Sequence, residues 1–304
     1  NNNQPSFVSV KKQIRGGVMK QIQNKWNKRI IVMISSVCLF CLTVMLCLIS
    51  TLANQHFMLE QNMQSDYAKK VAAEINREIQ SYHYEIGAPA EALEKIVSEE
   101  LVQKNIELFI RNRYEKEPVE LIGEKEVEEK LQEIINTYKQ EEAEDDPFAS
   151  EENNLLIYMT SGIFRRGIQS IYLMSFIDQI LTIRERMVSF LPMISSILLV
   201  LLSGVFYLYR MSWKKVLWSF AVVIGGAGFQ LLSLSVSLYL YDMASQLDIR
   251  TQALEHLLDT YILSFIQFFS VVAIVEVVIA AGLWWIGKRV NTEKKVFSKR
   301  NGYK

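Results

Sequence analysis

A single glutamate, Glu276, stands in the apolar stretch SVVAIVEVVIAAGLWW (residues 270–285), with no basic residue beside it to compensate its charge. A charged side chain at the centre of a lipid bilayer costs at least about 2.5 to 3.5 kcal/mol, so a glutamate there is either satisfied by internal contacts or functional. Gln230 is well placed to meet it, because at 1.5 Å per helical residue the two lie about 16 Å and about 21 Å from the same end of their segments. We expect Glu276 and Gln230 to form an intramembrane polar pair, with the glutamate mostly protonated because hydrocarbon disfavours its charged form.

The segment that leads to Gln230, AVVIGGAGFQ (residues 221–230), is rich in small residues. Small side chains spaced four residues apart let two helix backbones approach closely in lipid. We therefore expect the third and fourth apolar segments to pack against each other through Ala221, Gly225, Gly226 and Gly228.

Three roles for Glu276 are open. It can be an internal contact, satisfied by Gln230 and by serines such as Ser203 or Ser233. It can meet a basic residue of a membrane partner, or it can bind a proton or cation on a transport path. The transport role is the least favoured of the three, because no other charged residue lies in any of the apolar segments.

Other candidates for chemistry are few and lack the spacing that chemistry needs. The three histidines form no H-E-x-x-H motif, and no Cys/His cluster has zinc spacing. Cys38 and Cys41 form a C-x-x-C, but in an apolar helix they are better interpreted as small packing residues than as a redox or metal pair. The acidic run QEEAEDDPFASEE (residues 140–152) lacks EF-hand spacing and is better interpreted as a solvated linker than as a calcium site.

The motifs of common enzyme classes are also missing. The chain has no G-x-x-x-x-G-K-[ST] phosphate loop and no G-x-S-x-G nucleophile motif, and its apolar segments contain no aspartate. The basic tails lack the interleaved aromatics that stack on bases, so nucleic acid is not an expected partner. The sequence therefore predicts no catalysis, no cofactor and no metal.

Four apolar stretches are long enough to span a hydrocarbon core of about 30 Å, which takes about 20 residues. They are residues 30–52, 188–209, 216–241 and 262–287. The fold class expected is therefore an all-α membrane protein with four transmembrane helices and a helical extracytoplasmic domain, residues 53–187, inserted between the first and the second.

Charge predicts the orientation, because basic flanks stay in the cytoplasm. Residues 1–29 hold seven bases and no acid, the turn at 210–215 holds three bases, and the tail at 288–304 holds seven bases against one acid. The short loop at 242–261 is acidic, and residues 53–187 carry 27 acids against 15 bases. Both termini are therefore expected inside, with residues 53–187 and 242–261 outside. Met19, which opens a short basic stretch before the first span, is the expected natural start, so that residues 1–18 are not native.

Tryptophans support the same orientation. Interfacial aromatic rings anchor helices at the depth of the lipid headgroups. All five tryptophans fall at the expected cytoplasmic ends of spans, and these interface anchors are Trp26, Trp213, Trp218, Trp284 and Trp285.

The exported segment has a helical pattern throughout. Apolar residues recur every four positions from Tyr67, a second helix is expected to open at Pro89, and a third to follow the break at Pro118 and Gly123. The segment contains no cysteine, so packing must hold it together, as suits a bacterial cell surface. Its last helix is expected to run into the second span, with Pro192 the expected place for any break.

The sequence favours a non-enzymatic cell-surface membrane protein. Its ectodomain is expected to act as a sensor, or as an interaction component of an envelope or secretion assembly, with a membrane or surface protein as partner besides the lipid bilayer. The alternative is a subunit of a transporter, with Glu276 and Gln230 near the path. In topology the layout is similar to four-span ABC permeases, but residues 210–215 form too short a loop for the ATPase contact of that family.

Overall fold

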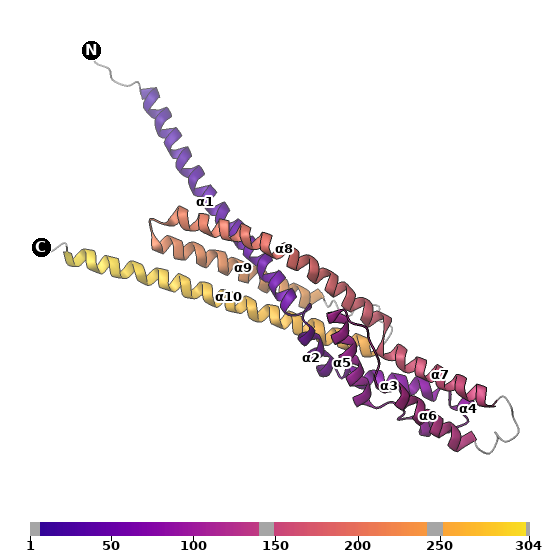
Figure 1. The fold of residues 1–304 in the computed structure, drawn as a ribbon. Helices are drawn as coiled ribbons and strands as arrows, with labels where there is room; N and C mark the ends of the chain where they lie inside the picture. The colour runs from indigo at the N-terminus through magenta and orange to yellow at the C-terminus, as the bar shows by residue number, and fades with distance from the viewer. Residues whose placement is uncertain (1–6, 140–148, 242–251, 302–304) are drawn as a thin grey trace, which may run out of the picture. The chain divides into compact units, whose positions relative to one another are not determined.

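The computed structural model describes residues 7–139, 149–241 and 252–301, and all the regular structure in them is helical (Figure 1). The all-α class is confirmed for these residues, which contain no strand. The helices are α1 (Phe7–Ser50), α2 (Gln55–Gln64), α3 (Tyr67–Gln80), α4 (His83–Ile86), η1 (Ala90–Leu93), α5 (Glu99–Glu115), α6 (Glu124–Lys139), α7 (Ala149–Ile168), α8 (Ile171–Tyr209), α9 (Trp213–Tyr241) and α10 (Gln252–Asn301).

The chain forms two compact units. The first, here called the span unit, comprises Asn1–Cys47, Met187–Tyr241 and Ile266–Lys304. The second, here called the insert unit, comprises Leu48–Arg186 and Asp242–Phe265. The chain therefore enters the insert unit twice, once through the long segment between the first two apolar stretches and again at the beginning of α10.

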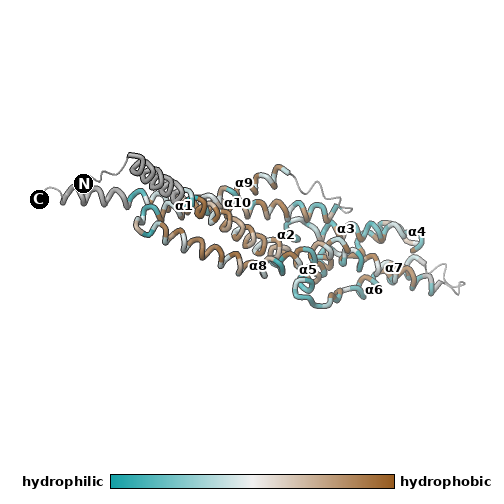
Figure 2. Tube along the Cα trace, turned by 90° about the horizontal axis from the view of Figure 1, so that it is seen from above, coloured by the Kyte–Doolittle hydropathy of each residue, from teal (hydrophilic) through white to brown (hydrophobic). Residues whose placement is uncertain are grey.

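Four helical segments in the described part of the chain are long and apolar enough to cross a membrane, as the sequence predicted. They are Trp26–Ser50, Asn153–Tyr209, Trp213–Tyr241 and Gln252–Arg289. Figure 2 shows that apolar residues extend along these helices, whereas the short helices of the insert unit mix polar with apolar residues. Large side chains such as Val200, Phe229 and Leu240 remain at least 70 % exposed. A helix that is apolar on its outward face as well as its inward face is suited to lipid.

The helix α8 passes without interruption through Pro192. Proline is the expected place for a break, because it lacks the backbone N–H and clashes with the preceding turn. Membrane-spanning helices tolerate proline, and the helix continues past it here, with Ser196 Oγ donating to Pro192 O at 2.7 Å. The helix expected over 155–186 is divided between α7, which ends at Ile168, and α8, which begins at Ile171 and continues into the second apolar segment.

The insert unit is built on amphipathic helices around one apolar core. On α3, Val71, Ile75 and Ile79 point into it at four-residue spacing and are at most 4 % exposed. Two amides fix the segments between helices. Asn76 exchanges two hydrogen bonds with the backbone of Val97, both 2.9 Å, and the fully buried Asn105 bonds to the backbone of Ile122 in the same way.

The prediction that the second helix of the insert starts at Pro89 is wrong. Pro89 precedes only the short 3-10 turn η1, and α5 begins at Glu99 with Ser98 as its N-cap, whose hydroxyl accepts from Leu101 N at 3.2 Å. Serine supplies the acceptor that the first helical N–H groups lack, so it marks the start better than proline does here. The expected break at Gly123 is present, with a φ of +78° that favours glycine.

The first turns of α10 differ from the expected loop at 242–261. Residues 242–251 lie outside the described residues, but α10 begins at Gln252 and packs into the insert core. Ala253, Leu254, Leu257, Leu258 and Tyr261 are all at most 5 % exposed. Their spacing puts them on one helical face, so the fourth apolar helix begins ten residues before the predicted span. Of the acidic run predicted to be a linker, 140–152, residues 140–148 lie outside the described residues, whereas 149–152 are helical and open α7. The native start at Met19 stays a prediction.

Candidate functional site

A polar cluster lies inside the span unit and joins three helices. Glu276 comes from α10, Gln230 from α9, and Ser36 and Thr43 from α1. Thr43 Oγ1 donates to Glu276 Oε1 at 2.7 Å. Gln230 Nε2 donates to Ser36 Oγ at 3.3 Å and to Gly226 O at 3.1 Å. These four side chains are called the polar cluster below.

Glu276 and Gln230 therefore do not bond to each other, in contrast to the pair that the sequence suggested. Each bonds instead to a hydroxyl of α1. Ser203 and Ser233, considered as partners for Glu276, are exposed. The signal that would have found the true partners is the spacing of Ser36 and Thr43, which lie seven residues apart and so share one face of α1.

The glycines of α9 allow the close approach that the polar cluster needs. A Cβ at Gly225 would lie 3.1 Å from the Cβ of Ala280, and a Cβ at Gly228 would lie 2.9 Å from the Cβ of Glu276. A Cβ at Gly226 would meet Ser36 Oγ on α1. Ala221 is 7 % exposed. Gly225 and Gly228 thus face α10, whereas Gly226 faces α1.

The second carboxyl oxygen, Glu276 Oε2, is buried and has no hydrogen-bond partner. A buried acceptor without a donor is costly, and an ionised carboxylate with one hydrogen bond and no cation is more so. The burial of Oε2 also shows how Glu276 is placed within the span unit. Oε1 is bonded to Thr43, and Oε2 is enclosed within the span unit.

The tryptophans and several bases form a second feature of the span unit, here called the basic belt. All five tryptophans are between 43 % and 63 % exposed. The guanidinium carbon of Arg289 lies 3.9 Å from the ring centre of Trp285, and Lys214 Nζ lies 5.6 Å from that of Trp218. Trp218 and Trp284 also lie together, with ring centres 6.4 Å apart. Cations over exposed indole rings suit the headgroup layer of a membrane.

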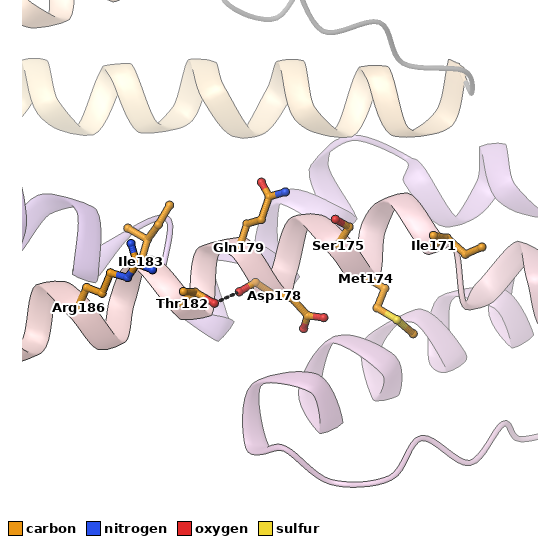
Figure 3. A pocket seen from close by; sticks show the side chains of 8 residues that line it. All are labelled: Ile171, Met174, Ser175, Asp178, Gln179, Thr182, Ile183 and Arg186. Carbon is orange, nitrogen blue, oxygen red and sulfur yellow. Dashed lines mark hydrogen bonds between the residues drawn. The ribbon is translucent and has the colours of Figure 1, made fainter.

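One face of α8 in the insert unit is exposed along its length and forms a shallow hollow of about 470 Å³. Figure 3 shows the side chains that line it, and we call them the α8 stripe: Ile171, Met174, Ser175, Asp178, Gln179, Thr182, Ile183 and Arg186. At about 100° per residue they spread over about half of the helix surface, on the side away from the buried Leu173, Ile177 and Ile180. Ile171 is 78 % exposed and Ile183 is 50 % exposed. Asp178 pairs with Arg113 of α5, which holds this part of α8 in place.

No grouping of the described residues points to a metal or to catalysis. None of their His, Cys, Asp and Glu side chains gather in threes that could hold an ion. His83 Nδ1 lies 3.0 Å from Gln80 O and its ring lies against Tyr84, which is a local helix-end contact. Cys38 Sγ is 3.8 Å from Ile194 O and Cys41 is exposed, and both are free thiols.

The fold and the polar cluster define the class of the molecule, an all-helical protein with four helices suited to cross a membrane. Comparison of the chain with protein families, with curated proteins and with solved structures found no match. The function must therefore be argued from the sites themselves.

Proposed function

We propose that this is a non-enzymatic, multi-pass protein of a bacterial cell membrane whose insert unit is extracytoplasmic and docks an amphipathic helix of another membrane-anchored protein. The α8 stripe is the docking surface. The observation that carries the proposal is the exposure of Ile171 and Ile183 on the half of α8 that lies away from its packed residues. Covering such an isoleucine is worth about 1.5 to 3 kcal/mol, and a partner helix laid along the stripe would cover both.

Charge indicates the character of the partner. Residues 53–187 carry 27 acids and 15 bases, so a helix with a basic outer face would be attracted toward this unit. Within the stripe, polar groups such as Gln179 and Thr182 lie between the isoleucines and offer hydrogen bonds that fix the register of the bound helix. The same helix α8 continues to Tyr209 as an apolar segment, so a partner anchored in the same membrane has a ready approach.

The orientation is part of the proposal. The basic belt supports a cytoplasmic position for the turn between α8 and α9 and for the region around Trp284 and Trp285, because basic and tryptophan residues gather on that side. Both termini are then inside and the insert unit is outside. Cysteine-accessibility labelling in intact cells at Glu133, expected reactive, and at Lys215, expected protected, tests this orientation.

The docking test is site-specific photo-crosslinking in native cells with the full chain. A benzophenone amino acid replaces Gln179 in the α8 stripe or, as a matched control, exposed Glu133 on α6. The expected result is an adduct from position 179 only, which is lost when Ile183→Lys is added and weakens as salt is raised. The crosslinked peptide should belong to an amphipathic helix of a membrane-anchored protein. Equal adducts at both positions, or an adduct unchanged by Ile183→Lys, would refute the proposal.

One observation favours a second function, a subunit of a transporter. Glu276 Oε2 is a buried acceptor without a partner in the polar cluster, and such a site can hold a proton or cation in transit. Reconstitution into vesicles with a pH-sensitive dye tests it: proton or cation flux that Glu276→Gln abolishes would favour transport, and equal flux in both would exclude Glu276 from a path.

A further inference from the structure

The insert unit contains a more enclosed cavity, separate in its chemistry from the α8 stripe. It measures about 290 Å³, close to the smallest pockets that bind ligands, and lies between α3, the junction of α7 and α8, and the first turn of α10. Its apolar wall includes Val71, Ile75 and Tyr172. Its polar lining includes Tyr67 and Glu74, both on α3. We call it the α3 pocket.

Tyr67 is the unusual residue of this pocket. It is only 2 % exposed, lines the pocket, and has no hydrogen-bond partner among the described residues. Burial, together with nearby Glu74, raises the pKa of its phenol. The hydroxyl therefore stays neutral at physiological pH and can accept or donate a hydrogen bond. The hydroxyl is not among the fully enclosed side-chain atoms that lack a partner. It is therefore open to the pocket that Tyr67 lines, where a polar group of a ligand can bond to it.

The charges of the pocket do not balance. Arg166 and Glu78 lie at its rim and compensate each other, with Arg166 Nη2 3.5 Å from Glu78 Oε1. Among the described residues, Glu74 has no basic partner. Its Oε1 accepts only a long hydrogen bond from Ala253 N, 3.4 Å, at the first turn of α10. Its other oxygen has no bond within the part of the chain that the structure describes. Within the described residues, the uncompensated charge of the pocket is therefore the carboxylate of Glu74, which lies near the phenol of Tyr67.

We propose that the α3 pocket binds a protonated primary amine, with its ammonium group between Glu74 and Tyr67 and its alkyl part against Val71, Ile75 and Tyr172. An ammonium has three donors and no acceptor. The carboxylate of Glu74 and the phenol oxygen of Tyr67 take two of these donors, and Ser170 at the α7–α8 junction takes the third. The amine is either a free small molecule or a lysine side chain of a peptide, since both carry the same group. This proposal does not depend on the docking role of the α8 stripe.

The test uses the full chain in lipid nanodiscs and measures ligand-induced thermal stabilisation. The probes are n-butylamine, the neutral isostere n-butanol as control, and N-acetyl-lysine amide for the peptide-borne source. A ligand that binds the folded state raises its apparent stability with concentration. The amine should stabilise the protein and the alcohol should not. If n-butylamine alone stabilises the protein, the ligand is a free small-molecule amine. If N-acetyl-lysine amide stabilises it as well, the pocket also accepts the lysine side chain of a peptide.

Two substitutions and a control locate the site. Glu74→Gln should weaken binding of n-butylamine at least about tenfold, because a hydrogen bond to a charged group is lost. Tyr67→Phe keeps the ring and removes only an unbonded hydroxyl, so it should leave the fold intact and weaken binding about fivefold. Glu133→Gln, a change of the same kind on α6, should have no effect. Equal stabilisation by the amine and the alcohol, no stabilisation by either, or amine binding unchanged in both Glu74→Gln and Tyr67→Phe would overturn the proposal.

Discussion

The first turns of α10 complete the core of the insert unit, and removing one side chain there should loosen helices far away in sequence. Leu257 is fully buried in the cluster that includes α3 and α5. A Leu→Ala change in a packed core costs about 2 to 5 kcal/mol, because transfer energy is lost and a cavity remains. Leu257→Ala should therefore destabilise the insert unit by at least about 2 kcal/mol.

Hydrogen exchange read out by mass spectrometry on the full chain in detergent is the appropriate assay. Amides that exchange through opening of the whole unit respond to its stability. Since 1.4 kcal/mol is a factor of ten, peptides from α3 and α5 should exchange at least about 30 times faster in Leu257→Ala. Loss of the hydrogen bond that Tyr261 Oη donates to Leu52 O, 2.7 Å, should have a smaller effect in the same direction in Tyr261→Phe.

The matched control lies on the same helix. Ile274 is 54 % exposed in the span unit, so Ile274→Ala should leave exchange in α3 and α5 unchanged. If Leu257→Ala also left these peptides unchanged, the beginning of α10 would not belong to the insert core, and the division of the chain into these two units would be wrong.

Three further predictions concern single contacts. Thr43→Val should lower the thermal stability of the protein in detergent by about 1 to 3 kcal/mol by removing the donor to Glu276, whereas Thr43→Ser should not; equal stability of the two variants would contradict the bond. Gly228→Ala should lower the stability by about 1 to 3 kcal/mol, because the added methyl group would overpack against α10. Gly204→Ala, whose methyl group would have no atom within 4 Å, should be neutral or slightly stabilising in the same melting assay. The reverse order would refute the close contact between α9 and α10. Burial raises the pKa of Tyr114 to about 12, above the value of about 10 in an unfolded chain, so its contribution to stability is complete below about pH 10 and is lost as pH rises to about 12. The free energy of unfolding, measured by chemical denaturation, should therefore fall more steeply over that window in the wild type than in Tyr114→Phe. Parallel curves for the two proteins would contradict this prediction.

Much of the fold can be predicted from the sequence, because a helix that crosses a membrane needs about 20 consecutive apolar residues and such segments are easy to recognise. The four apolar helices, the helical insert and the break at Gly123 are all predicted by hydropathy and periodicity. The beginning of α10 was missed because Asp248, Glu255 and Asp259 make 242–261 look like an acidic loop. The stripe from Ala253 to Tyr261 was present, but its partner is a core assembled from residues some 80 to 200 positions earlier, and pattern alone cannot name that partner.

The polar cluster was predicted only in part. Depth along the helices drew attention to Glu276 and Gln230, and small residues drew attention to the glycines of α9. The rotation of each helix about its axis decides which side chains meet, and depth carries no information on rotation. Ser36 and Thr43 of α1 therefore take the bonds that were expected between Glu276 and Gln230. The α3 pocket has no sequence signal at all, since its residues come from four separate helices.

The two-part composition of the insert unit also has a consequence for biosynthesis. Its first part ends at Arg186, and the last residue of its core, Tyr261, is made about 75 residues later, after α9. At a synthesis rate of 5 to 20 residues per second, this delay lasts about 4 to 15 s. During that time the nascent chain exposes the apolar surface that Leu257 and Tyr261 will cover. The core of the insert unit is therefore complete only after Tyr261 has been synthesised.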